Sequence, residues 1–269
     1  MILMRACSGL DELEACVKLQ IETWGYCEGD IIPRRAFLVA QKIGGQVIGA
    51  FDTAQPGAPP NGGPESLIGF AFSLPGVKTG PDAKTGQTEP RAYLHSHMLA
   101  VRESYRNHGL GAQLKLQQRN EALSRGIRHM EWTFDPLEIK NSFLNIHKLG
   151  AIVCGYRVDF YGVSSSRLQG GLPTDRLLAE WHLDSPRVRA TLEGRPAVAY
   201  IIEERITVPA SIYQWKASEA GRERALQVQM ENRRRFQHAF SQGLAVLGFV
   251  RDAEGNGVFE LGPNTLADF

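Results

Sequence analysis

Arg106, Gly109 and Gly111 stand in the order R-x-x-G-x-G, directly after the apolar run at residues 99–101 and ahead of a stretch with helical spacing. A glycine lets a ligand approach the backbone closely, because it has no side chain. The first N–H groups of a helix have no intrahelical acceptor, and together with the helix dipole they attract anions. The spacing therefore predicts an anion site, most often one for a phosphate.

Two common phosphate-binding motifs do not fit this stretch. The P-loop requires lysine and then serine or threonine after its last glycine, whereas Ala112 and Gln113 follow Gly111 here. The dinucleotide motif G-x-G-x-x-G would need a third glycine where Leu114 stands.

His95 and His97 lie two residues apart in the strand-like run H-S-H-M-L-A-V. Side chains alternate along a strand, so we expect both histidines on one face, together with Leu99 and Val101. Histidine titrates near neutral pH, and either residue could accept a proton from a reacting group. They could instead be sheet histidines satisfied by their neighbours, or a zinc pair, although no third ligand is near in sequence.

The elements that must position these residues can be read from hydrophobic spacing and turn residues. Gly25 predicts the end of a first helix, and Pro33 predicts the start of a second. The pattern predicts a mixed sheet flanked by helices over residues 1–185, of the α/β or α+β class. Residues 186–269 predict a smaller appended unit of a strand, a charged helix from Ser218 to Gln242 and a hairpin. Turn-rich stretches at 53–65 and 75–90 predict long loops.

Composition excludes several classes of protein. The net charge of +1 gives no basic field for a nucleic-acid partner, and the arginines at 233–235 fit a solvated helix face. The four cysteines form no C-x-x-C motif or disulfide framework, which favours a reducing, cytoplasmic compartment. No run approaches the roughly 20 apolar residues of a membrane span, and the N-terminus lacks the pattern of a signal peptide.

The stretch L-A-V-R-E-S-Y-R-N-H-G-L-G-A-Q-L resembles the acyl-CoA-binding motif of the GNAT acyltransferases. The order of helices before it, the strand after it and the K-L-G sequence at 148–150 also agree, so the resemblance covers about residues 1–185. More narrowly, H-S-H-M-L-A-V, W-T-F-D-P-L and N-I-H-K-L-G-A look like a GNAT branch of uncharacterised substrate with a C-terminal extension.

The resemblance implies acetyl-CoA or another acyl-CoA as co-substrate, without a metal. Its pyrophosphate would be bound by backbone amides in a loop that Arg106 opens. The backbone of Leu99 and Val101 would pair with the pantetheine arm, and Asn141 would also contact that arm. The amides belong to Asn107, His108, Gly109, Leu110, Gly111 and Ala112.

The resemblance also implies direct transfer of an acyl group to an amine, with a general base and a general acid. Counting back along the strand as in some GNAT enzymes makes His95 the base, with His97 as the other candidate. The tyrosine that often protonates the leaving thiolate is replaced by Ile146, so Tyr161 or Tyr156 would have to substitute. Asp135 could hold a cationic acceptor, or it could simply cap a turn.

Three functions stay open at this point. The leading one is an N-acetyltransferase acting on a small-molecule or peptide amine. The second is an acyl-CoA-binding or regulatory protein that has lost catalysis, as the missing tyrosine would allow. The third is a scaffold in which the C-terminal helix mediates a homodimer.

Overall fold

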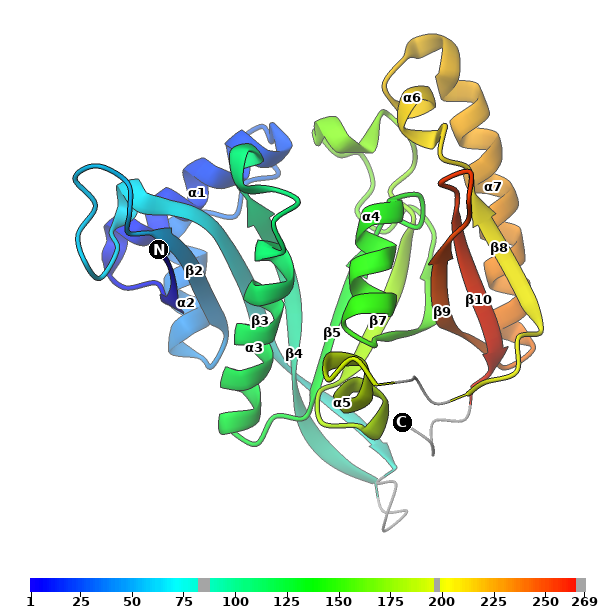
Figure 1. Ribbon diagram of the computed structural model, residues 1–269, viewed down its shortest axis with the longest axis horizontal. Helices are drawn as coiled ribbons and strands as arrows, with labels where there is room; N and C mark the ends of the chain where they lie inside the picture. Colours follow the sequence, from blue (N-terminus) through cyan, green and yellow to red (C-terminus); the bar gives the residue numbers. More distant parts are fainter. Residues whose placement is uncertain (82–87, 196–198, 265–269) are drawn as a thin grey trace. The chain divides into compact units, whose positions relative to one another are not determined.

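The computed structural model describes residues 1–81, 88–195 and 199–264. It divides into two compact units, each with a sheet and flanking helices (Figure 1). The first unit comprises Met1–Met130 with Ser165–Arg167, and the second comprises Glu131–Ser164 with Leu168–Phe269. Strands flanked by helices in both units confirm the predicted α/β class.

The first unit has the antiparallel strand order β1-β2-β3-β4. Two helices cover one face of this sheet and a third covers the other (Figure 1). The elements are β1 (Ile2–Ala6), α1 (Gly9–Trp24), α2 (Arg34–Lys42), β2 (Gln46–Asp52), β3 (Leu67–Pro81), β4 (Thr88–Val101) and α3 (Leu110–Ser124), with single 3-10 turns at Pro64–Ser66 and Glu103–Tyr105.

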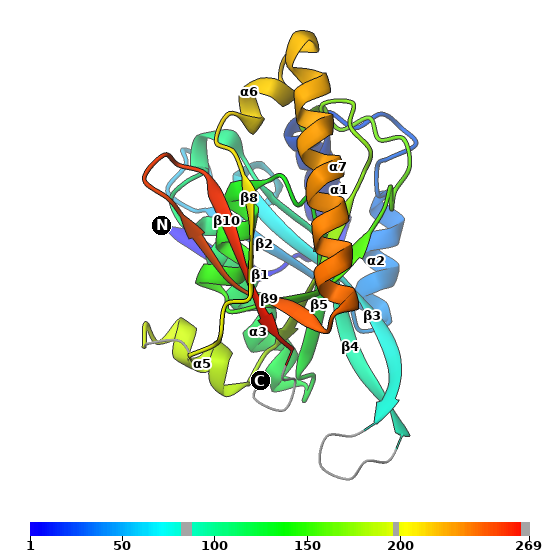
Figure 2. The same ribbon diagram turned by 90° about the vertical axis from the view of Figure 1, so that its right-hand side faces the viewer.

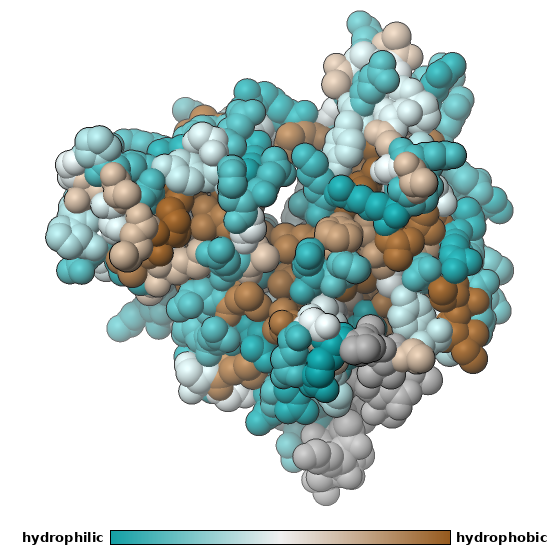
Figure 3. All heavy atoms as spheres, viewed as in Figure 1, coloured by the Kyte–Doolittle hydropathy of each residue, from teal (hydrophilic) through white to brown (hydrophobic). Residues whose placement is uncertain are grey.

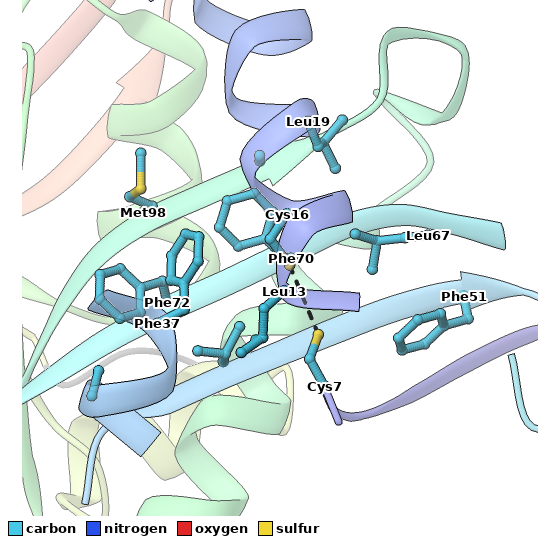
Figure 4. Close-up of a cluster of buried hydrophobic side chains, with 13 residues drawn as sticks. Cys7, Leu13, Cys16, Leu19, Phe37, Phe51, Leu67, Phe70, Phe72 and Met98 are labelled. Atoms are coloured by element: carbon cyan, nitrogen blue, oxygen red, sulfur yellow. Dashed lines mark hydrogen bonds between the residues drawn. The ribbon is translucent and has the colours of Figure 1, made fainter. Parts of the chain in front are cut away.

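The larger core of this unit lies between the sheet and the pair α1 and α2 (Figure 4). The ring of Phe37 packs edge-on against Phe72 at 4.8 Å and against Phe70 at 5.8 Å between centroids. The thiols of Cys7 and Cys16 lie 3.8 Å apart in the same core, and all four cysteines are free. The opposite face packs against α3 through Leu110 and Leu114.

Local signals placed the first two helices correctly. The backbone N–H of Gly25 ends α1 by donating to Ile21 O at 2.8 Å, with Gly25 at a left-handed φ of 69°. Such a φ costs glycine little, because it has no Cβ. Pro33, predicted as the first residue of the second helix, immediately precedes α2, and its fixed φ suits a helix start.

The predicted loop at 75–90 is wrong over its two arms. β3 and β4 continue as a paired hairpin, with Pro75 opposite Leu94 and Pro81 opposite Thr88. Residues 82–87 lie outside the described part of the chain. The glycines and prolines suggested a loop, but the two arms satisfy each other's backbone groups by pairing.

The second unit has the strand order β5-β7-β6-β9-β10-β8. The long helix α7 packs on β6, β8 and β9, and Figure 2 shows it running beside the last three strands. The elements are β5 (His129–Phe134), α4 (Ile139–Ser142), a π-helix (Phe143–Lys148), β6 (Ile152–Arg157), a 3-10 turn (Arg167–Gln169), β7 (Arg176–His182), α5 (Pro186–Leu192), β8 (Glu204–Val208), α6 (Ile212–Lys216), α7 (Glu219–Ser241), β9 (Leu244–Arg251) and β10 (Gly257–Pro263).

The C-terminal segment adds strands to the sheet of this unit. β9 and β10 form the predicted antiparallel hairpin, and β9 pairs with β6 through Val246 and Val153. Residues 131–164 therefore pack in one compact unit with the C-terminal segment. The division into a catalytic domain at 1–185 and an extension at 186–269 is a functional one, and it stays a prediction.

The three consecutive arginines of α7 do not form one solvated face. Arg233 is bound to buried Asp175, Arg235 is paired with Glu204, and only Arg234 is largely exposed, beside Glu231. Successive helical residues point about 100° apart, so the three side chains must reach different surroundings.

No helix among the described residues has the length and apolar character that would cross a bilayer. Figure 3 shows hydrophilic side chains spread over the viewed face, with smaller hydrophobic areas between them.

We predict that Phe37→Ala lowers the free energy of unfolding by about 3–5 kcal/mol, because it removes a fully buried ring and leaves a cavity. Its neighbour Leu38 is 47% exposed, so Leu38→Ala should change stability by less than about 0.5 kcal/mol. Urea unfolding followed by circular dichroism measures both variants. Equal losses in the two would contradict the packing described here.

Candidate functional site

The turn between β4 and α3 is set by two left-handed residues. Asn107 has φ 65° and Gly109, which immediately precedes α3, has φ 78°. A Cβ added at Gly109 would meet no atom within 4 Å, so the backbone there faces open space. This geometry leaves the start of α3 accessible to a ligand, as the glycine spacing predicted.

The backbone N–H groups of residues 107–112 have no acceptor within the described chain. Gln113 is the first residue of α3 whose N–H has a backbone acceptor, and it donates to Gly109 O at 3.1 Å. Free amides at a helix start carry the positive end of the helix dipole. The loop at 106–112 therefore has the donors and the electrostatics of an anion site.

Side chains fix this loop to the sheet. Arg106 Nε donates at 2.9 Å to the carbonyl oxygen of Val101, which is the last residue of β4. The hydroxyl of Tyr105 donates to Asp52 Oδ2 on β2 at 2.7 Å and accepts from Gln55 at 3.1 Å. The hydrogen bond from Tyr105 also lowers the pKa of Asp52.

A β-bulge in β4 separates the predicted residues of that strand into two faces. Ser73 pairs with Ser96 and Phe72 pairs with Met98, so His97 has no opposite residue in the register. An extra residue of this kind shifts the alternation of the side chains that follow it. This shift explains why Leu99 and Val101 do not lie on the face of the two histidines, as the following contacts show.

His95 and His97 do share a face, with their ring centroids 6.1 Å apart. His97 also meets the ring of Phe72 at 6.1 Å, on the side of the sheet that α1 and α2 cover. Leu99 and Val101 instead pack on the α3 side. The prediction that all four share one face is therefore wrong for Leu99 and Val101, because the bulge at His97 intervenes.

Burial lowers the pKa of His97 to about 4, with a smaller contribution in the same direction from the charge of His95. His97 is therefore a neutral imidazole at pH 7.

A buried polar cluster beneath α3 was missed by the sequence reasoning. Lys115 Nζ donates to Ser96 Oγ at 2.7 Å, and Ser96 Oγ donates to Gln118 Oε1 at 2.9 Å. Burial lowers the pKa of Lys115 well below its ordinary value. The available signal was helical spacing, since Lys115 and Gln118 share the buried face of the helix with Leu110 and Leu114.

The predicted residues of the second unit are placed as follows. Tyr161 is 44% exposed, and its hydroxyl lies 2.8 Å from Thr133 Oγ1, with the guanidinium of Arg176 5.3 Å from its ring centroid. Asn141 is exposed on α4.

Tyr156, the alternative acid, is buried, and its hydroxyl donates to Asp175 at 2.6 Å. Burial and this bond raise its pKa, so we assign Tyr156 a structural role.

The helix before K-L-G continues as a π-helix, which the sequence did not predict. Leu149 N–H donates to Leu144 O at 3.0 Å, five residues back. Ile146, where the sequence resemblance would place a tyrosine, is 2% exposed. His147 stacks on Phe143 with centroids 4.4 Å apart, and its pKa is lowered mainly by desolvation. π-Helical turns are frequent at functional sites, but the side chain at position 146 has no proton to give.

Asp135 does not have the free carboxylate that a cationic acceptor would need. One oxygen accepts from the backbone of Leu137 at 2.8 Å, and the other accepts from Lys216 Nζ at 2.8 Å. Lys216 is buried and also binds Glu138. The turn alternative for Asp135 is therefore correct, and the chain supplies its own cation.

The candidate residues divide between the two units. His95, His97, Leu99, Val101 and the loop at 106–112 belong to the first unit, whereas Asn141 and Tyr161 belong to the second.

Comparison with known proteins supports the fold and nothing finer. No protein-family model and no curated protein matches the chain in sequence. The Arabidopsis thaliana NAA60 structure in complex with acetyl-CoA is 15% identical, covers 68% of this chain and 99% of its own, and gives a TM-score of 0.52. Two weaker likenesses are NAA60 with a bisubstrate analogue, 17% identical over 67% and 98% of the chains with a TM-score of 0.48, and the Escherichia coli ribosomal-protein-S18-alanine N-acetyltransferase, 14% identical over 68% and 94% with a TM-score of 0.47.

The likeness to NAA60 with acetyl-CoA spans nearly all of that protein and about two thirds of this chain. At this level of identity it bears on architecture alone. Together with the strand, glycine turn and helix at 99–124, it shows that the chain has the fold of the GNAT acetyltransferases, as the sequence resemblance predicted.

Proposed function

We propose that the protein is an acyl-CoA-dependent N-acyltransferase that transfers an acetyl or other acyl group to an amine. The observation that carries the proposal is the set of acceptor-free N–H groups at 107–112, at the start of a helix in a GNAT fold. Each charge near such a helix start is worth about 0.3–1 kcal/mol when exposed. Several converging amides add charge-assisted hydrogen bonds, which suits the pyrophosphate of CoA.

The pantetheine arm of the co-substrate would continue from this loop along β4. We propose that the backbone of Leu99 and Val101 pairs with it and that Asn141 contacts it. Val101 O already accepts from Arg106, but a carbonyl oxygen has a second lone pair for another donor.

The reaction needs a proton acceptor. The amine nitrogen attacks the thioester carbonyl carbon, the new C–N bond forms, and the C–S bond breaks to release the CoA thiolate. An alkyl amine near a pKa of about 10.4 is mostly protonated at pH 7, and supplying its free base costs roughly 4–5 kcal/mol. A base acting directly or through water removes the amine proton.

We assign the base to His95. Burial lowers the pKa of His97 to about 4, so a proton on His97 is poorly held near neutral pH. His95 shares the same face of β4 at 6.1 Å between ring centroids, and a neutral imidazole has a ring nitrogen that can accept the amine proton. His97 would then contribute to the shape and polarity of the site beside the base.

We assign the acid that protonates the leaving thiolate to Tyr161. The residue is 44% exposed, and the hydrogen bond with Thr133 fixes the position of its hydroxyl. The acceptor is a small-molecule or peptide amine. We further propose a cytoplasmic protein, with a homodimer as an open alternative to a monomer.

The second candidate function is a catalytically lapsed acyl-CoA-binding or regulatory protein. It is favoured by buried Ile146, which stands where the family often has its acid. Release of CoA from acetyl-CoA that no amine accelerates would support this candidate and contradict the enzyme. A panel of phenethylamine, spermidine, glucosamine and an alanine-initiated peptide provides that test.

We predict that the protein binds CoA and acetyl-CoA with micromolar affinity, and that Gly109→Glu, alone or with Gly111→Glu, weakens binding by about 100-fold or more. The carboxylate would repel the pyrophosphate and occupy its place. Calorimetry with both ligands measures the effect. The matched control is Gly126→Glu at the other end of α3, because Gly126 has the same φ of 78° and also faces open space. Equal weakening by both variants, or no binding to the wild type, would contradict the assigned loop.

We predict that His95→Gln lowers the rate of amine-dependent CoA release by about 100-fold to 10,000-fold at pH 7. The base is lost while the CoA loop is untouched, so affinity for CoA should stay within about twofold of the wild type. The free thiol of CoA is followed with a thiol reagent between pH 5.5 and 9. His97→Gln is the matched control, and a larger loss in that variant would transfer the role of base to His97.

We predict that stability falls as the pH decreases from about 6.5 toward 4, because the unfolded chain then binds a proton at His97 that the folded chain refuses. The stability is fully present above the unfolded pKa and is lost on acidification. His97→Gln should remove this part of the slope, whereas His238→Gln on the exposed face of α7 should retain it. Urea midpoints at pH 7, 6 and 5 measure the slope, and identical slopes in all three proteins would contradict the assignment.

A further inference from the structure

Asp175 is a fully buried carboxylate that joins three parts of the second unit. It accepts from Tyr156 Oη on β6 at 2.6 Å and from the backbone N–H of Asp159 at 3.0 Å. From α7 it accepts both Nε and Nη2 of Arg233, at 2.8 and 2.9 Å. Two parallel bonds from one guanidinium fix orientation as well as distance.

The next residue back, Thr174, is hydrogen-bonded to the segment that follows β6. Its carbonyl accepts from Phe160 N–H at 2.9 Å, and its hydroxyl accepts from Tyr161 N–H at 2.9 Å. Its own N–H donates to Asp159 Oδ1 at 3.0 Å. Asp159 has a φ of 43°, a left-handed value that costs a residue with a side chain and needs such support.

Two side chains of helix α7 bind the residues on either side of Thr174. Gln229 Nε2 donates to Pro173 O at 2.8 Å, and Arg233, one helical turn later, binds Asp175. Residues four apart lie on the same face of a helix, so one face of α7 fixes residues 173–175. Those residues in turn bind the three consecutive backbone N–H groups of 159–161.

The segment at residues 159–163, which follows β6, has large side chains exposed to solvent. Phe160 is 48% exposed, Tyr161 is 44% exposed and Val163 is 99% exposed. The rings of Phe160 and Tyr161 are in edge contact at 4.8 Å. An exposed segment would be poorly ordered without support, and here the backbone N–H groups of residues 159–161 are fixed by residues 174 and 175.

We propose that Arg233 and Asp175 are positioning residues for Tyr161, so that the C-terminal helix α7 sets the geometry of the group that protonates the leaving thiolate. The inference rests on the proposed function, in which Tyr161 is the acid. It gives the C-terminal segment a role that its sequence does not reveal. Arg233 acts through Asp175 and Thr174 and touches neither substrate.

The test uses Arg233→Lys, which keeps the charge but loses the paired bonds to Asp175. The matched control is Arg234→Lys, because the side chain of Arg234 is 75% exposed and pairs with Glu231 on its own helix. Hydrogen–deuterium exchange of peptides spanning 157–163 reports on the support. We expect exchange at 159–161 to become about tenfold faster in Arg233→Lys and to stay unchanged in Arg234→Lys.

The kinetic arm uses acetyl-CoA and the best amine of the panel above. We expect kcat to fall about tenfold in Arg233→Lys, with KM for acetyl-CoA within about twofold, because the CoA loop is not altered. In a Tyr161→Phe background the same substitution should have no further effect on kcat, since its target is already absent. Thr174→Val is a second, nearly isosteric variant should Arg233→Lys fail to fold, and it should give the same pattern.

Unchanged exchange at 159–161 would overturn the proposal, and so would an undiminished effect of Arg233→Lys in the Tyr161→Phe background. A wild type that binds CoA but transfers nothing to any amine would overturn the proposed function and, with it, the role in catalysis. The exchange measurement separates these cases, because it needs no reaction.

Discussion

The backbone N–H groups at the start of α3 impose the constraint on which the first unit depends. Six consecutive residues, 107–112, leave these groups without an acceptor in the described chain, and such groups are tolerated only where water or a ligand can reach them. The backbone of the turn must therefore be accessible to water or a ligand and must also be held in one conformation. Gly109 keeps it open, whereas Arg106 on Val101 and Tyr105 on Asp52 keep it fixed to the sheet. Strands β2 and β4 supply those two anchors, so the antiparallel sheet serves to place one helix start.

Signals that act within a few residues were readable in the sequence. Gly25 as a helix stop, Pro33 ahead of α2, the β9–β10 hairpin and the R-x-x-G-x-G turn all appear where they were predicted, because a special φ or a missing Cβ decides each of them. The bulge at His97 and the π-helix at 143–148 were not readable. Each adds one residue to a regular element, and only the packing of that element against its neighbours decides where the extra residue goes.

The candidate site shows the same division between local and tertiary information. The open turn ahead of α3 could be predicted to the residue, since glycines and a helix start define it, and its role as an anion site stays a prediction. The two histidines could be placed on one strand and one face, but Leu99 and Val101 were assigned to the wrong face, because one bulged residue reverses everything beyond it. The burial that lowers the pKa of His97 comes from tertiary packing, which the pattern H-S-H cannot express. The arginines at 233–235 looked alike in sequence and have three different partners in the structure.

The contribution of the ion pair between Arg233 and Asp175 follows from the energetics of buried ion pairs. Removing two charges from water is expensive, and replacing a buried pair with apolar side chains is often neutral or stabilising, so such a pair is weak evidence for stability. An apolar pair at 175 and 233 would keep α7 packed through Phe236 and Ala225, which are fully buried. It could not accept the N–H of Asp159 or the hydroxyl of Tyr156, and it could not fix the direction of residues 173–175. The carboxylate at position 175 therefore contributes orientation that packing alone would leave free, and Tyr161 is the exposed side chain whose backbone depends on it.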